Sequence, residues 1–148
     1  MLRVALFTFV FLLMASVNFV SAQVPKAPTG TVSICKEIDD DWKCVGQSDT
    51  WTANTPYNVL FVNSVPVGVS FIGIIIHKQG PDGKDTDFVN EYQQDIGETN
   101  RKYATVGDEL KLPAGKYSIY IIRWDKRETL THQGNLPEYF AKTTLTVK

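Results

Sequence analysis

The residues of this chain that are the clearest candidates for specific chemistry are its two cysteines, Cys35 and Cys44. Eight residues separate them, including the consecutive aspartates Asp39, Asp40 and Asp41. A structural zinc site generally needs four cysteine or histidine ligands, and a thioredoxin-type redox site needs C-x-x-C spacing, so this pair fits neither. We therefore predict a structural disulfide, which in turn predicts an oxidising compartment.

The spacing also predicts how the two cysteines are positioned. Residues 31–37 and 42–47 are expected to form the two strands of a hairpin with an aspartate turn at its tip. In that register the cysteines lie directly opposite each other, close enough for a disulfide. The same register places Ile34 opposite Val45, on the same side of the hairpin.

No motif in the sequence indicates catalysis as clearly as the cysteine pair indicates a disulfide. The segment 68–73, GVSFIG, misses the G-x-S-x-G spacing of a nucleophile elbow by one residue and lies inside a predicted strand. His77 and His132 are general-base candidates, but nothing in the sequence pairs either one with a nucleophile. We predict no catalytic residues. An enzymatic function stays open only if folding brings one of these histidines beside acidic residues in a pocket.

Carboxylates, the ligands that calcium prefers, cluster at two places. One cluster is the aspartate triplet between the cysteines, and the other consists of Asp82, Asp85 and Asp87. The second cluster lacks the D-x-[DN]-x-[DN]-G order and the distant glutamate of a calcium loop. Solvated turns explain both clusters, so we predict neither a metal site nor a cofactor.

Tryptophans and their neighbours give the most usable indication of function. Trp124 ends a predicted strand and is expected to be exposed at the start of a long loop, residues 125–138. Loops of this length are often binding elements, although a tolerated surface excursion is the alternative. The predicted ligand-binding residues are Trp124, Arg123, Lys126, Arg127, His132 and Trp51.

The elements that must position these residues are short strands separated by clusters of Gly, Pro, Asn and Asp. Residues 69–78 and 116–124 are apolar on both alternating faces, which predicts the middle of each of two sheets. Residues 86–95 fit either a helix face or one side of a strand, and we favour a strand because residues 69–78 need a hairpin partner. The predicted strands are 31–37, 42–47, 57–62, 69–78, 86–95, 109–112, 116–124 and 139–148.

The first 22 residues combine one arginine, a long apolar run and a small-residue ending, which predicts a signal peptide, 1–22. A membrane anchor is the alternative, weakened by Ser16 and Asn18 within the run and by the lack of a basic stop after it. Residues 23–30 are expected to form an extended N-terminal tail, and residues 31–148 a single domain. No later segment is apolar for long enough to cross a membrane, so we predict no membrane span in the mature chain.

Together these features predict an all-β fold, an antiparallel immunoglobulin-like β-sandwich of about seven or eight strands. The segment Leu112-Pro113-x-Gly115-x-Tyr117 resembles the last hairpin of many immunoglobulin-like domains. Without the leader the chain keeps 14 basic and 16 acidic side chains, a balance that argues against nucleic acid as a partner.

The functional prediction is a non-catalytic secreted or periplasmic domain that acts through surface binding. A protein partner is favoured, contacted by long edge strands or by residues 123–138. The alternative is a carbohydrate-binding module that uses Trp124, Trp51 or Trp42 as a stacking platform for sugar rings.

Overall fold

The computed structural model describes residues 29–97, 102–124 and 139–148. Within these ranges no helix has the length and apolar character needed to cross a membrane. The signal peptide predicted for residues 1–22 and the loop 125–138 lie outside the described residues. The strands are β1 (Gly30–Cys35), β2 (Glu37–Ile38), β3 (Cys44–Val45), β4 (Thr50–Trp51), β5 (Tyr57–Asn63), β6 (Phe71–Gln79), β7 (Asp85–Asp95), β8 (Tyr103–Leu110), β9 (Gly115–Arg123) and β10 (Ala141–Val147).

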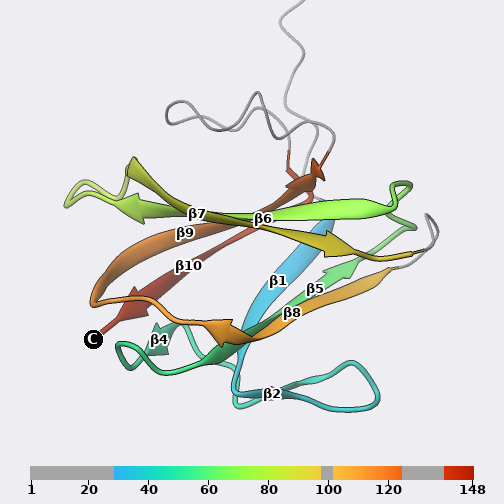
Figure 1. The fold of residues 1–148 in the computed structure, drawn as a ribbon, viewed down its shortest axis with the longest axis horizontal. Coiled ribbons are helices and arrows are strands. Elements are labelled where there is room, and N and C mark those ends of the chain that lie inside the picture. Colours follow the sequence, from blue (N-terminus) through green and yellow to red (C-terminus); the bar gives the residue numbers. More distant parts are fainter. Residues whose placement is uncertain (1–28, 98–101, 125–138) are drawn as a thin grey trace, which may run out of the picture.

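Two sheets form the body of the domain (Figure 1). One has three strands in the order β1-β5-β8, and the other has five in the order β4-β10-β9-β6-β7. Neighbouring strands are antiparallel except for β4, which pairs in parallel with β10. A short separate ladder joins β2 to β3. The predicted all-β fold is therefore confirmed.

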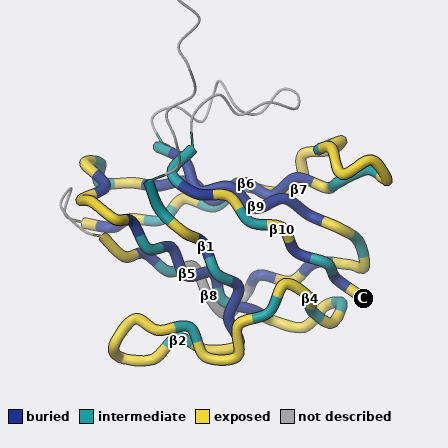
Figure 2. The backbone as a smooth tube through the Cα atoms, turned by 180° about the vertical axis from the view of Figure 1, so that it is seen from behind, coloured by how far each residue is buried: buried dark blue, intermediate teal, exposed yellow. Residues whose placement is uncertain are grey.

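The two sheets bury their facing side chains in one apolar core, and Figure 2 shows that the buried residues concentrate in these strands. Alternation along each strand produces this core, because every second side chain points to the same face of a sheet. Val59 and Phe61 of β5 meet Ile72 and Ile74 of β6 in the same cluster. The other strands add Val32, Ile34, Ala104, Leu110, Tyr117, Ile119, Ile121, Ala141, Leu145 and Val147.

The prediction that the two doubly apolar segments occupy separate sheets is wrong. Strands β6 and β9 are neighbours in the five-stranded sheet, paired from Ile72 opposite Arg123 to Lys78 opposite Tyr117. Both strands are apolar on both faces because the outer face of this sheet carries a second buried cluster. That cluster consists of Ile75, Tyr120 and Ile122, with Tyr139 packed against it.

The N-terminal edge of the fold begins within the segment predicted as a tail. The N–H of Gly30 donates to the carbonyl of Phe140 at 3.0 Å, and Gly30 starts β1. A side chain at this position would meet the Phe61 ring at 2.5 Å, so only glycine allows β1 to approach β5 so closely. The Thr29 hydroxyl donates to the buried Asn63 side chain at 2.7 Å, which further ties this end of the chain to β5.

The disulfide between Cys35 and Cys44 is present, with 5.3 Å between the two Cα atoms. The predicted hairpin register is nevertheless wrong, because Cys44 lies opposite Ile38 and Val45 lies opposite Glu37. Cys35 instead ends β1, where it lies opposite Asn58 of β5.

The turn chemistry explains this shift of the hairpin register. The Asp39 carboxylate accepts hydrogen bonds from the N–H groups of Asp41 and Lys43, at 3.0 and 2.8 Å. The N–H of Trp42 donates to the Asp39 carbonyl, and the N–H of Asp39 donates to the Lys43 carbonyl. Asp39 therefore begins the turn instead of standing at its centre, which moves the tip toward Asp41.

The structure confirms that residues 86–95 are a strand, since β7 pairs with β6 along its whole length. Strand β8 is longer than predicted: it begins at Tyr103, whereas the prediction started at residue 109. Gly107 and Asp108 are turn-forming residue types inside this strand, so the sequence pattern did not predict its first part. Pairing with β5 overrides their local preference.

Candidate binding site

Strand β7 forms one edge of the five-stranded sheet. Within the described part of the chain, β6 is the only strand that pairs with it, and most of its side chains are exposed. Its eleven residues make it the longest strand among those described. A long edge strand presents unpaired backbone groups, which another chain can use.

The backbone groups that face away from β6 can be assigned from the ladder. The N–H of Ile96 donates to the carbonyl of Ser70 at 2.9 Å, which makes these two residues a hydrogen-bonded pair. In an antiparallel ladder such pairs alternate, so Asn90, Tyr92 and Gln94 bond to β6 and the residues between them face outward.

The outward N–H of Glu91 is already occupied, because it donates to the side chain of Asn90 at 2.8 Å. This bond agrees with the assignment. Among the described residues, the backbone of Gln93 and the N–H of Asp95 are the outward groups that the regular ladder leaves, because the carbonyl of Asp95 accepts from the Gln94 side chain at 2.9 Å.

The charged residues of β7 are all acidic. The strand contains the carboxylates Asp85, Asp87, Glu91 and Asp95 and no lysine or arginine. The side chains of Glu91, Gln93 and Asp95 lie on the outer face of the sheet, because the alternating Tyr92 packs against the core. This edge therefore combines outward backbone groups with negative charge.

Two irregularities divide the strand into a regular and an irregular half. The partners of β6 jump from Asn90 to Phe88 and again from Asp87 to Asp85, so Val89 and Thr86 are extra residues on β7. Such bulges twist an edge and interrupt pairing. Only the stretch 90–95 keeps the regular geometry that a further strand would need.

Apolar side chains are also exposed along this edge. Phe88 is 44% exposed on β7, and its neighbour Val89 in the bulge is 37% exposed. Phe71 of β6, opposite Asp95, is 40% exposed. Large apolar side chains at the surface are often protein-contact positions, so they add a second feature that suits a protein partner.

Of the six predicted ligand-binding residues, three lie outside the described residues: Lys126, Arg127 and His132. Trp124 and Arg123 lie at the end of β9 and are half-buried. The Trp124 ring packs over Gly73, whose missing side chain leaves 3.0 Å between the ring and the place where a Cβ would stand. The expected exposure of Trp124 is thus wrong, because Gly73 makes room for the ring against β6.

Trp51 lies on β4, away from the end of β9 where Trp124 lies. Its indole N–H donates to the carbonyl of Pro56 at 3.2 Å, and its ring packs edge-to-face on Tyr57 at 6.0 Å. Trp51 is half-buried against the core. Trp42 is the more open of these two rings, with 42% of its surface exposed.

His77 has an acidic side chain nearby, that of Asp85, but the histidine itself is buried. Its ring packs edge-to-face against Phe88 and Tyr120, at 6.0 Å from each, and the Tyr120 hydroxyl donates to the Asp85 carboxylate. Burial lowers the pKa of His77, against a smaller opposing effect of Asp85. Burial, and next the bond to Asp85, raises the pKa of Tyr120. His77 is only 4% exposed, so this cluster is a packed junction between β6, β7 and β9.

Each carboxylate cluster contributes one aspartate that organises a turn, whereas Asp85 and Asp87 of the second cluster belong to β7. Asp82 accepts from the N–H of Lys84 at 3.1 Å and pairs with the Lys84 ammonium at 3.5 Å, within the turn that joins β6 to β7. Asp39 organises the hairpin turn between the cysteines. In residues 29–97, 102–124 and 139–148, no three acidic, histidine or cysteine side chains are grouped in a way that could hold a metal ion.

The sequence did not reveal the β7 edge as a site. A signal was present, since acidic residues recur along 85–95 without a basic one. Which strand of a sheet lies at its edge is decided only by tertiary pairing. No protein-family model, curated protein or solved structure matches this chain.

Proposed function

We propose that this chain is an exported, non-catalytic, immunoglobulin-like domain that binds a protein partner through the edge of β7. The partner is an extended segment carrying lysine or arginine at alternate positions, which adds to the five-stranded sheet as a further strand. The observation that carries this proposal is the acidic edge itself, with the outward backbone of Gln93 and Asp95 beside the carboxylates of β7.

The order of the strands supports the immunoglobulin-like assignment. The sequence of neighbours β1-β5-β8 corresponds to strands A, B and E of that fold, and β10-β9-β6-β7 corresponds to G, F, C and C′. The hydroxyl of Tyr117, near the start of β9, donates to the carbonyl of Pro113 at 2.8 Å. A tyrosine bonded to the backbone just upstream of strand F is a recurrent feature of immunoglobulin-like domains.

The position of the disulfide sets this chain apart from antibody domains. The disulfide joins Cys35 to Cys44 at one end of the sandwich, whereas in antibody domains it crosses between strands B and F. The corresponding strands here, β5 and β9, contain no cysteine. Apolar side chains of these two strands, including Phe61 of β5 and Ile121 of β9, belong to the same core cluster and take the place of that bridge.

Export is supported by the disulfide, because such bonds persist in oxidising compartments. A non-catalytic role is supported by the packing around His77, which closes that histidine off from solvent. Both features suit a domain that works by presenting a stable surface.

The charge of β7 favours a basic partner over a second copy of the same strand. Two β7 strands paired with each other would bring carboxylates together across the new ladder, and like charges directly opposite are destabilising. Lysine or arginine at alternate positions would instead face Glu91 and Asp95 on the outer side of the sheet. Backbone hydrogen bonds in this mode provide affinity, and the alternating side chains provide specificity.

A synthetic peptide of about ten residues, in which lysine alternates with valine, tests this proposal. We expect it to bind the domain in calorimetric titration and to slow amide exchange at Gln93 and Asp95. A peptide with glutamate in place of lysine should bind much more weakly. Equal binding of the two peptides, or no binding of the lysine peptide at millimolar concentration, would overturn the proposal.

Two variants at one position separate backbone pairing from side-chain contact. Gln93→Pro removes an outward N–H without touching the ladder to β6, and edge strands tolerate proline there. Gln93→Ala keeps the N–H and removes the side chain. Peptide binding should be lost in Gln93→Pro and retained in Gln93→Ala, with both variants folded by circular dichroism.

A further inference from the structure

A groove of about 750 Å³ lies where the β2–β3 hairpin meets the three-stranded sheet. Its volume lies within the range of small-molecule sites. The lining is mainly polar. It includes Glu37, Asp39, Asp40, Trp42, Asn58 and Thr105.

Trp42 has an unusual backbone conformation in this groove. Its φ is 59°, in the left-handed region that a bulky side chain rarely adopts. Glycine is the residue favoured after a tight hairpin turn of this kind, where a tryptophan costs on the order of 1–2 kcal/mol. The chain thus retains a large aromatic side chain at a position where local folding favours glycine, and such strain tends to occur at functional sites.

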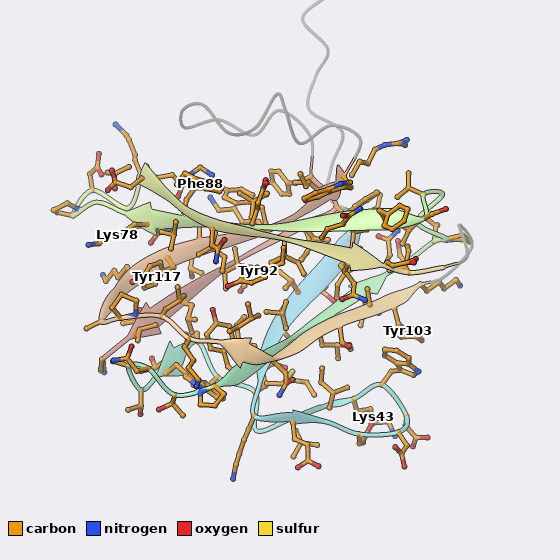
Figure 3. All side chains as sticks on the ribbon, in the orientation of Figure 1. Lys43, Lys78, Phe88, Tyr92, Tyr103 and Tyr117 are labelled. Atoms are coloured by element: carbon orange, nitrogen blue, oxygen red, sulfur yellow. A yellow bond between two sulfur atoms is a disulfide. The ribbon has the colours of Figure 1, made fainter. Side chains whose placement is uncertain are left out.

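A second aromatic residue meets Trp42 from a distant part of the chain. Tyr103 of β8 stacks on the indole with 5.8 Å between ring centroids and 26° between planes. Both side chains are 42% exposed. In Figure 3 the Tyr103 ring lies above the hairpin tip that carries Lys43, well away from Phe88 of β7. The pair forms an aromatic platform at the surface.

The platform is held in place before any ligand arrives. The disulfide ties Cys44 of the hairpin to the end of β1. The Asp39 carboxylate holds the turn through two backbone N–H groups. The side chain of Asn58 on β5 donates to the carbonyl of Lys36 at 3.0 Å and joins the base of the hairpin to the sheet. Preorganisation of this kind reduces the ordering cost of binding.

We propose that this groove binds a neutral saccharide, with one face of a sugar ring stacked on Trp42 and the hydroxyl groups bonded to the carboxylates of Glu37 and Asp40. A sugar ring has a C–H face that packs on an aromatic ring and hydroxyl groups that donate to carboxylates. Three carboxylates line the groove against the single lysine, Lys36, so an anionic sugar is disfavoured.

This site is independent of the protein-binding edge. The groove is built from the hairpin and from the three-stranded sheet, whereas β7 belongs to the five-stranded sheet. The two proposals can therefore fail separately. The Gln93→Pro variant should lose peptide binding and bind saccharide as the wild type does.

Calorimetric titration of the whole domain with neutral oligosaccharides tests the groove. The probes are oligomers of glucose in β-1,4 and α-1,4 linkage, of mannose, and of N-acetylglucosamine, with a galacturonate oligomer as the anionic comparison. We expect at least one neutral oligomer to bind, to shift the NMR signal of the Trp42 indole, and to bind more tightly than the anionic oligomer. Absence of binding by every neutral oligomer at about 10 mM, or tighter binding of galacturonate, overturns the proposal.

Variants of Trp42 locate the contact. Trp42→Gly suits the left-handed backbone, so the domain should fold while the platform is removed. Its affinity for the bound oligosaccharide should fall roughly tenfold or more, as for a central aromatic contact. Trp42→Phe keeps an aromatic ring and should retain most of the affinity. Undiminished affinity in Trp42→Gly would place the sugar elsewhere and refute the assignment.

Discussion

Cys35 and Cys44 are joined by a disulfide although neither lies opposite the other in a strand ladder. Cys44 pairs with Ile38 in the hairpin, and Cys35 pairs with Asn58 in the three-stranded sheet. The bridge therefore links two ladders. It attaches the β2–β3 hairpin to β1 of the three-stranded sheet, whereas the predicted bridge would only have joined the two strands of one hairpin.

Replacing both cysteines by alanine should lower the free energy of unfolding by about 2–3 kcal/mol, the value expected for closure of a short loop. Alanine is preferred to serine because Cys35 is fully buried and a hydroxyl there would lack a partner. Urea denaturation measures the change, and reduction of the wild type should reproduce it. Unchanged stability in the double variant would show that the bridge does not restrain the fold.

The positive φ of Trp42 predicts that glycine at this position gives a more stable domain than alanine does. Trp42→Gly relieves the left-handed strain, whereas Trp42→Ala keeps the Cβ that causes it, and both variants lose the stack on Tyr103. The glycine variant should be more stable than the alanine variant by about 1 kcal/mol, the reverse of the usual order within a strand or helix. Thermal unfolding of the two variants checks this order. If alanine is the more stable, Trp42 does not carry strain.

The hydrogen bond from Tyr117 to the carbonyl of Pro113 should contribute to stability. Tyr117→Phe removes it and leaves a carbonyl without its partner, so we expect a loss of about 1–2 kcal/mol in denaturant unfolding. Tyr57→Phe is the matched control. The Tyr57 hydroxyl is buried without a hydrogen-bond partner among the described residues, so its removal should be neutral or stabilising. Equal losses in both variants would contradict the role of the Tyr117 bond.

His77 should make stability depend on pH. Burial lowers its pKa below the ordinary value of 6.5, so the unfolded chain binds a proton at a pH where the folded chain does not. Stability is then greatest above pH 6.5 and falls as the pH drops from that value toward the lowered pKa. Urea denaturation at a series of pH values should show this fall in the wild type and a smaller one in His77→Leu.

His132→Gln is the control for that series, because His77 and His132 are the two histidines of the chain. The control should retain the pH dependence of the wild type. A slope that disappears in the control and persists in His77→Leu would assign the titration to His132.

Local patterns in the sequence were sufficient to identify most strands. Residues 57–62 and 116–124 are short, rich in β-branched and aromatic residues and bounded by turn-forming residues, which is typical of a buried strand, and the structure contains both strands. The disulfide was predictable as well, because the predicted export and the shortage of further ligands for a zinc site leave two cysteines few alternatives. Strand β8 escaped prediction because Gly107 and Asp108 are turn-forming types.

The sequence by itself determined that this chain is all-β and that its cysteines pair, because burial of alternate side chains and thiol chemistry are properties of short segments. Only the tertiary structure decided that β6 and β9 share one sheet, that β7 lies at its edge, and that Trp42 stacks on Tyr103. The physical reason is that pairing between distant strands depends on the packing of both faces of each sheet. No single segment contains that information.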